Sequence, residues 1–225
     1  MTSDVTTKAA GDDEPAAFVV PAGPPDAVAD TAVDAAVDAA VDVEDRPDHA
    51  LGPEWTRGAD GLLFRTAARV ILLDEHDRVL LIRGHDADQP ERSWWFTIGG
   101  GIDAGESARE AAVREVREET GIVLADGDLV GPVLTRSAIF DFFFEHCRQD
   151  EEIFLARVPA SSFVAEDRSG WTALEQDVID ELRWWSLPDL AAVEIEVFPE
   201  GLAGLVADLL PTWDGVTRHL GLARE

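Results

Sequence analysis

Apolar runs of strand length alternate with polar turns along the chain from about residue 61 onward. These runs occupy residues 67–73, 78–83, 93–98, 131–136, 138–144, 152–158 and 181–186. Short apolar runs bounded by turn residues are typical of β-strands. Residues 187–193 are predicted to form a short helix, and residues 199–210 carry leucine and valine at helical spacing. The second of these helices is expected to pack on the sheet.

A charged segment, residues 107–119, interrupts the strands and is predicted to be a helix. Ser107 and Glu110 have the spacing of a capping box, and Gly121 is placed to end the helix in a left-handed turn. Alanine and valine at positions 108, 111, 112, 113 and 116 give the helix an apolar side.

Three carboxylates share one face of this predicted helix. Glu115, Glu118 and Glu119 lie at positions i, i+3 and i+4, so they repel one another and destabilise the helix. A divalent cation reverses that effect, because Mg²⁺ prefers carboxylate and water oxygens and is usually shared with substrate phosphates. We therefore expect a Mg²⁺ site here, with Mn²⁺ as a substitute; the other interpretation is a solvated, charged helix face.

The residues around the carboxylates fit the same chemistry. Arg114 is next to Glu115 and is placed to orient it by a charge-assisted hydrogen bond. Glu106 precedes the helix and is expected to reach the metal directly or through water. Residues 99–101 are glycines, which let the backbone approach a cation or a phosphate closely, and the carbonyl of Gly100 is a candidate metal ligand.

The segment 100–122, reading GGIDAGESAREAAVREVREETGI, has the form G-x5-E-x7-R-E-U-x-E-E-x-G-U, where U is a bulky aliphatic residue. This resembles an intact Nudix box, the metal-dependent diphosphate-cleaving motif of the Nudix hydrolases. The resemblance implies an α/β fold, an α/β/α sandwich around a mixed sheet, over residues 58–216. It also implies that Glu115, Glu118, Arg114 and Glu106 are catalytic and that Gly100, Glu115, Glu118 and Glu119 hold the metal.

Site residues outside the box are less sharply indicated. Arg83 is a candidate for binding substrate phosphate. Trp94 and Trp95 precede the glycines, where adjacent strand residues point in opposite directions; one is expected in the core, and Trp95 is taken as the substrate-binding one. Ile98 stands where most Nudix domains have proline. Many members also use a carboxylate from a later loop as general base or metal ligand, for which Glu175 is the first candidate, ahead of Glu151 and Glu152.

Composition narrows the choice of partners and compartment. The formal net charge is -28, which argues against nucleic-acid and anionic-membrane binding. The single cysteine, Cys147, excludes an intrachain disulfide and suits a reducing compartment. The sequence contains no apolar stretch long enough to cross a membrane, and its first residues lack the features of a secretory signal. A cytoplasmic protein acting on a small nucleotide diphosphate is expected; homodimers are common in the family, and the oligomeric state is left open.

The ends of the chain differ from its middle. Residues 1–57 are rich in Ala, Asp, Val and Pro, and Asp30, Asp34, Asp38 and Asp42 recur every four residues. A helix would stack these like charges, so a disordered acidic tail is predicted, with a transient amphipathic helix or docking arm as the alternative. Residues 217–225 are predicted to be a C-terminal tail.

Three functions are compared. The leading hypothesis is Mg²⁺-dependent hydrolysis of a diphosphate linkage in a nucleoside diphosphate joined to another moiety. An isoprenoid diphosphate isomerase needs a paired Cys and Glu at the site, and Cys147 is distant from the box in the sequence. A catalytically silent sensor of nucleotide metabolites, or a partner-binding module, is the third; such proteins usually have a damaged box or a separate DNA-binding domain.

Overall fold

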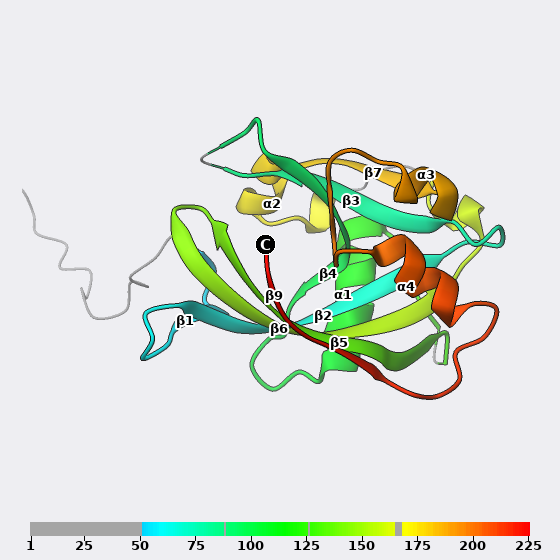
Figure 1. Ribbon diagram of the computed structural model, residues 1–225, viewed down its shortest axis with the longest axis horizontal. Helices are drawn as coiled ribbons and strands as arrows, with labels where there is room; N and C mark the ends of the chain where they lie inside the picture. The colour runs from blue at the N-terminus through cyan, green and yellow to red at the C-terminus, as the bar shows by residue number, and fades with distance from the viewer. Residues whose placement is uncertain (1–50, 88, 126, 165–167) are drawn as a thin grey trace, which may run out of the picture. The chain divides into compact units, whose positions relative to one another are not determined.

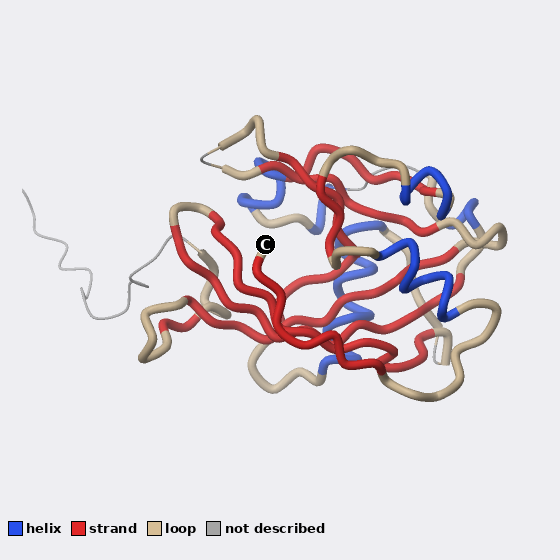
Figure 2. The backbone as a smooth tube through the Cα atoms, viewed as in Figure 1, coloured by secondary structure: helices blue, strands red, loops and turns tan. Residues whose placement is uncertain are grey.

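The structure, a computed structural model, describes residues 51–87, 89–125, 127–164 and 168–225. The predicted acidic tail therefore lies, up to residue 50, outside the described residues. The strands form one mixed sheet in the order β7-β3-β4-β2-β6-β5-β9, with β1 beside β2 and β8 beside β4 (Figures 1 and 2). The strand bounds are β1 Thr56–Arg57, β2 Leu63–Leu73, β3 Val79–His85, β4 Ser93–Gly101, β5 Leu129–Phe142, β6 Glu145–Arg157, β7 Ile179–Trp185, β8 Glu196–Phe198 and β9 Arg218–Arg224.

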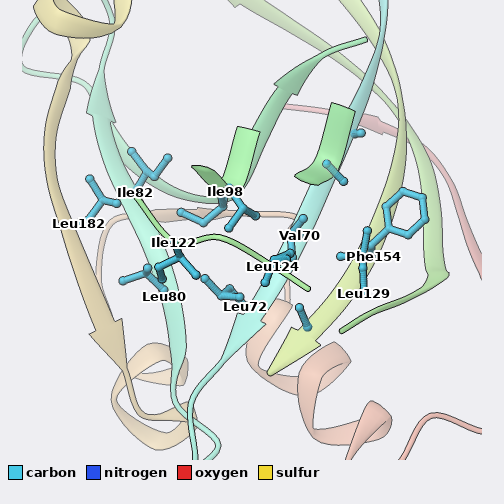
Figure 3. Packing of buried hydrophobic residues seen from close by; sticks show 14 of the residues in the cluster. Val70, Leu72, Leu80, Ile82, Ile98, Ile122, Leu124, Leu129, Phe154 and Leu182 are labelled. Carbon is cyan, nitrogen blue, oxygen red and sulfur yellow. The ribbon is translucent and has the colours of Figure 1, made fainter. Parts of the chain in front are cut away.

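Helices cover both faces of this sheet (Figure 1). They are α1 (Ala108–Thr120), α2 (Ala173–Val178), α3 (Leu187–Ala191) and α4 (Leu202–Leu209), with short 3-10 turns η2 (Ala160–Ser162) and η3 (Arg168–Gly170). The alternation of side chains along β2 explains the two layers. Val70 and Leu72 share a buried cluster with α1, whereas Ile71 and Leu73 share another with α3 and α4. Figure 3 shows the first cluster. The predicted α/β/α sandwich around a mixed sheet is confirmed.

The predicted elements occur at nearly the predicted places, with one exception among the strands. Residues 131–136 and 138–144, predicted as two strands, belong to the single strand β5, and β6 begins at Glu145 instead of near residue 152. The turn between them is formed by Phe143 and Phe144, which have φ of 54° and 62°. Gly or Asn normally supplies such a left-handed turn, so two phenylalanines gave no turn signal.

Both predicted tails contribute to the domain. Residues 218–224, expected in a tail, form strand β9, which pairs in parallel with β5. At the other end, Leu51 and Trp55 are buried in a cluster with Leu63 and Cys147, so the folded part begins before residue 58. Within the described ranges, no helix is long and apolar enough to cross a membrane.

Candidate active site

Helix α1 presents its carboxylates to the glycine loop at the end of β4. The capping box is present, with the backbone N–H of Ser107 donating to Glu110 Oε2 at 2.9 Å, and Gly121 ends the helix at φ 71°. Both features confirm the sequence prediction. The buried face of α1 carries Glu115 and Glu119 next to the alanines and Val116 that pack on the sheet. The same stripe that anchors the helix therefore brings two carboxylates to the glycines at the end of β4.

The glycines of β4 make room for these carboxylates. A Cβ at position 100 would lie 2.7 Å from Glu115 Oε1, so only glycine lets that carboxylate lie against the loop. Gly99 has φ 128°, and a Cβ there would lie 2.2 Å from the carbonyl oxygen of Ala68 on β2. The Gly99 N–H donates to Glu119 Oε2 at 2.7 Å. The glycines therefore allow the carboxylates to approach the backbone closely, as the sequence predicted for a cation or a phosphate.

Arg114 joins the residues around the loop. Its Nη1 donates to Glu115 Oε1 at 2.7 Å and to Glu118 Oε2 at 3.1 Å, and its Nε and Nη2 donate to Glu106 at 3.0 Å each. Nη2 also donates to the Gly101 carbonyl at 2.9 Å. The guanidinium has donors in a fixed fork that can bridge several acceptors at once. The expected contact between Arg114 and Glu115 is present, and Glu106 is tied to Arg114.

A third carboxylate completes the group. Glu115, Glu119 and Glu175 can each place one oxygen so that all three lie within 4.8 Å of one another; we call these residues the carboxylate cluster. Glu175 is on the short helix α2, not in a loop as predicted, and the Thr172 N–H donates to its Oε2 at 2.7 Å. The segment before α2 is packed tightly against α1, since a Cβ at Gly170 would lie 2.9 Å from the Glu118 carbonyl oxygen.

The competing candidates have other surroundings. Glu151 is buried and paired with Arg136 and Arg69, and Glu152 is exposed. Glu118, predicted as a metal ligand, lines the same cleft but lies outside the cluster and is bound to Arg114.

Electrostatics favours a cation at the carboxylate cluster. Burial raises the pKa of Glu119 well above its usual range, and the charge of Glu115 raises it further. Burial also raises the pKa of Glu115, against the effect of Arg114. Glu106 differs, because its hydrogen bonds from Arg114 lower its pKa. Buried carboxylates in one group need a proton or a metal ion for balance, and an all-carboxylate donor set suits Mg²⁺ or Mn²⁺.

The cluster opens into a cleft of about 760 Å³. Its apolar side includes Trp94 and Phe142, whose ring centroids are 6.5 Å apart in an edge-to-face contact, together with Trp55, Phe96 and Phe140. Phe140 and Phe142 come from β5, and no sequence pattern singled them out as site residues. The polar side includes Arg69, Arg136, Glu151 and Glu225, which we call the arginine wall.

The structure corrects the choice between the two adjacent tryptophans. Trp95 is buried at 3% exposure and packs edge-to-face on Trp185, with centroids 5.1 Å apart. Trp94, on the opposite side of β4, lines the cleft. The sequence predicted that the two tryptophans point in opposite directions. Which of them faces the cleft depends on which face of the sheet α1 covers. Arg83 is also not among the residues lining the cleft; its guanidinium lies near Asp180 and Glu181, at 3.9 and 3.8 Å.

No sequence pattern predicted the arginine wall, and Glu151 was a candidate only for a different role, as general base or metal ligand. Arg136 on β5 and Glu151 on β6 are direct cross-strand partners and form an ion pair. Glu151 also lies 3.4 Å from Arg69 Nε, and Arg69 Nη1 donates to the Gly99 carbonyl at 2.6 Å. The registers of β5 and of β2 against β6 bring these residues together, and a single sequence does not contain them.

Comparison with known proteins identifies the same family as the sequence motif does. The NUDIX domain family matches residues 63–208. The chain is 30% identical over 119 residues to the uncharacterized Nudix hydrolase YvcI of Bacillus subtilis (strain 168), covering 53% of this chain and 65% of that protein. It is 30% identical over 121 residues to the NAD-capped RNA hydrolase NudC of Pseudomonas aeruginosa (strain LESB58), covering 54% and 36%. The chain thus spans less than two thirds of the length of these relatives. A MutT protein structure from Methanosarcina mazei Go1 is 22% identical, with a TM-score of 0.45, covering 64% of this chain and 91% of that one.

Proposed function

We propose that this chain, which belongs to the Nudix hydrolase family, uses Mg²⁺ to hydrolyse a diphosphate linkage in a nucleoside diphosphate joined to another moiety. The observation that carries this proposal is the carboxylate cluster, whose three oxygens can lie within 4.8 Å of one another at the side of a cleft of about 760 Å³. An oxygen-only donor set with two buried members, next to a cleft of ligand size, is what a metal-dependent phosphoanhydride hydrolase needs.

Each residue near the carboxylate cluster has a separate role in this proposal. Glu115 and Glu119 hold the cation, with Gly100 and Glu118 at the edge of the site. A Mg²⁺ ion held there would neutralise charge on the diphosphate and would make the attacking water more acidic. Arg114 holds Glu115 in place through its hydrogen bond of 2.7 Å.

Glu175 accepts the proton of the attacking water. Glu106 suits that role less well, because both of its oxygens accept from Arg114 and its pKa is lowered. A carboxylate with a lowered pKa is a weaker base.

The apolar side of the cleft supports a nucleotide as substrate. Trp94 is half-buried next to Phe142, and Arg92 lies 5.4 Å from the centroid of the Trp94 ring. Exposed aromatic faces bind bases by stacking, without discriminating strongly among them. A net charge of -28 disfavours a long polyanion, so we propose a small nucleotide substrate in preference to RNA.

The test is product release from a panel of nucleoside triphosphates, dinucleoside polyphosphates, nucleotide sugars, coenzymes and capped RNA, with Mg²⁺, with Mn²⁺ and with EDTA. Glu119→Gln should reduce turnover at least about 100-fold, and the exposed Glu194→Gln should not. Activity on one compound class that needs the divalent ion and is lost in Glu119→Gln supports the proposal. Binding of a nucleotide without turnover above Glu119→Gln on any compound would overturn it in favour of a silent sensor.

A further inference from the structure

The arginine wall contains one arginine whose partners differ in how firmly they are held. Arg136 pairs through Nε with Glu151 and through Nη1 with Glu225, and only 7% of its side chain is exposed. Glu151 comes from the neighbouring strand β6, is buried, and is also bound by Gln149 Nε2 at 2.5 Å. It is therefore a fixed component of the sheet.

Glu225 is held through a single neighbouring strand: its N–H donates to the Ile139 carbonyl of β5 at 2.9 Å, and 8% of its side chain is exposed. It follows β9, which pairs with β5 along one edge and has mostly exposed side chains. Edge strands with few buried contacts open at low cost in free energy. In the view of Figure 1 the end of β9 lies between the β5–β6 hairpin and α2, and Glu225 lines the cleft together with Phe142 and Glu175. Burial raises the pKa of the Glu225 carboxyl despite Arg136, whereas Arg136 and Arg69 outweigh burial at Glu151 and lower its pKa.

The Glu225 carboxylate thus occupies one arm of a buried guanidinium in the same cleft as the carboxylate cluster. Carboxylate and phosphate oxygens make the same charge-assisted hydrogen bonds to arginine. Without Glu225, Arg136 Nη1 would face the cleft as an unpaired donor next to the place where a diphosphate binds in the proposed function.

We propose that Arg136 is a second anion-binding position of the cleft, for a phosphate group of the substrate other than the one held at the carboxylate cluster, and that Glu225 is an internal competitor for it. This rests on the proposed function for the identity of the ligand. Substrate binding displaces Glu225 from Arg136, and the strength of that ion pair sets how much negative charge a substrate must carry in order to compete. The chain thereby selects against ligands with a single anionic group.

The experiment is titration calorimetry of the full chain with inorganic pyrophosphate in EDTA, which needs no turnover. Glu225→Gln should bind pyrophosphate about tenfold more tightly than the wild type. Glu152→Gln removes the same charge from an exposed position on β6 and should not change binding. In the double variant Arg136→Gln, Glu225→Gln the gain should vanish.

Two further measurements keep the test decisive. Thermal melts identify any variant that does not fold; if Arg136→Gln is one, Arg136→Lys, which keeps the charge but loses the fork, should reduce the gain. Equal binding by Glu225→Gln and Glu152→Gln, or a gain that persists without Arg136, would overturn the proposal.

The KM of the hydrolysed substrate shows whether the anion bound by Arg136 is a phosphate group of that substrate. It should fall in Glu225→Gln; an unchanged KM with tighter pyrophosphate binding would assign Arg136 to a separate anion and overturn its assignment to substrate. Absence of turnover in every variant would instead count against the proposed function, and the pyrophosphate titration would still decide the role of Arg136.

Discussion

The carboxylate cluster and the arginine wall both bury glutamates in one cleft, and they balance that charge in opposite ways. At the cluster, burial raises the pKa of Glu119 well above its usual range and Glu115 adds to the effect. At the wall, burial of Glu151 is outweighed by Arg136 and Arg69, and its pKa is lowered. The wall carries its own cations, whereas in the proposed function a cation from solution completes the charge balance at the cluster. The opposite pKa shifts of Glu119 and Glu151 therefore follow from their surroundings: a second carboxylate lies beside Glu119, and two arginines lie beside Glu151.

The largest effect on stability should come from breaking the wall. Glu151→Gln leaves the buried Arg136 and Arg69 short of a counter-charge, and the free energy of unfolding should fall by about 3 kcal/mol. Urea unfolding followed by tryptophan fluorescence measures the loss. Glu152→Gln, on the exposed side of the same strand, should change it by less than about 0.5 kcal/mol. Equal losses in the two variants would mean that the ion pairs of the wall do not stabilise the fold.

The loss of stability in Glu151→Gln should depend on pH. Because the pKa of Glu151 is lowered in the folded protein from its ordinary value of 4.5, the charged form contributes stability above that pH. This contribution is lost as the pH falls through the lowered pKa. The stability difference between wild type and Glu151→Gln should be largest above about pH 5 and shrink on further acidification. A difference that grows in acid would contradict the assignment.

The carboxylate cluster and the arginine wall also differ in how much of each could be predicted from the sequence. The cluster is mostly local: Glu115 and Glu119 lie one helical turn apart, and the capping box, the glycines and Arg114 lie within the same short segment. Helical periodicity therefore predicts their common face correctly, and the α/β/α fold was implied by the resemblance to the Nudix hydrolases. Glu175 was found only because of the family resemblance, and its helix α2 is too short to show periodicity.

The wall depends on contacts between residues far apart in the chain. Arg136 contacts Glu151 because of the β5–β6 register. A turn of two phenylalanines sets that register. Glu225 follows strand β9, which was predicted to be part of a tail. The prediction that Trp95 binds substrate is wrong for a related reason. Packing decides which face of β4 turns to the cleft, and that face carries Trp94. Local patterns predict elements; tertiary pairing decides which side chains share a cleft.

A moderate effect is expected where the cluster is held in place. Arg114→Lys replaces a fork that reaches Glu106, Glu115, Glu118 and the Gly101 carbonyl by a single ammonium group. Turnover should fall about 10- to 100-fold, and the Mg²⁺ concentration for half-maximal activity should rise. Steady-state kinetics with a Mg²⁺ titration separates the two effects. Arg117→Lys, on the exposed side of the same helix, should leave both quantities unchanged; a loss there as large as in Arg114→Lys would point to the helix as a whole.

The smallest effect should have the opposite sign to that at the wall. In EDTA, Glu119→Gln removes a buried carboxylate from beside Glu115, and the melting temperature should rise by a few degrees. Added Mg²⁺ should stabilise the wild type and not the variant, because a ligand that binds the folded state raises its stability. Differential scanning calorimetry at both conditions tests this. A lower melting temperature for Glu119→Gln in EDTA would show that the cluster, like the wall, is already balanced.

The position of Gly121 has a consequence for the backbone of α1. Gly121 ends the helix directly after Thr120, so Glu119 lies in the last turn. The aligned peptide dipoles of a helix place a partial negative charge at that end, and this favours a nearby cation by about 0.3–1 kcal/mol. The helix dipole therefore disfavours an ionised Glu119 and favours a bound divalent ion at the same point. Main chain and side chains of α1 act together in making this end of the helix attractive to a metal.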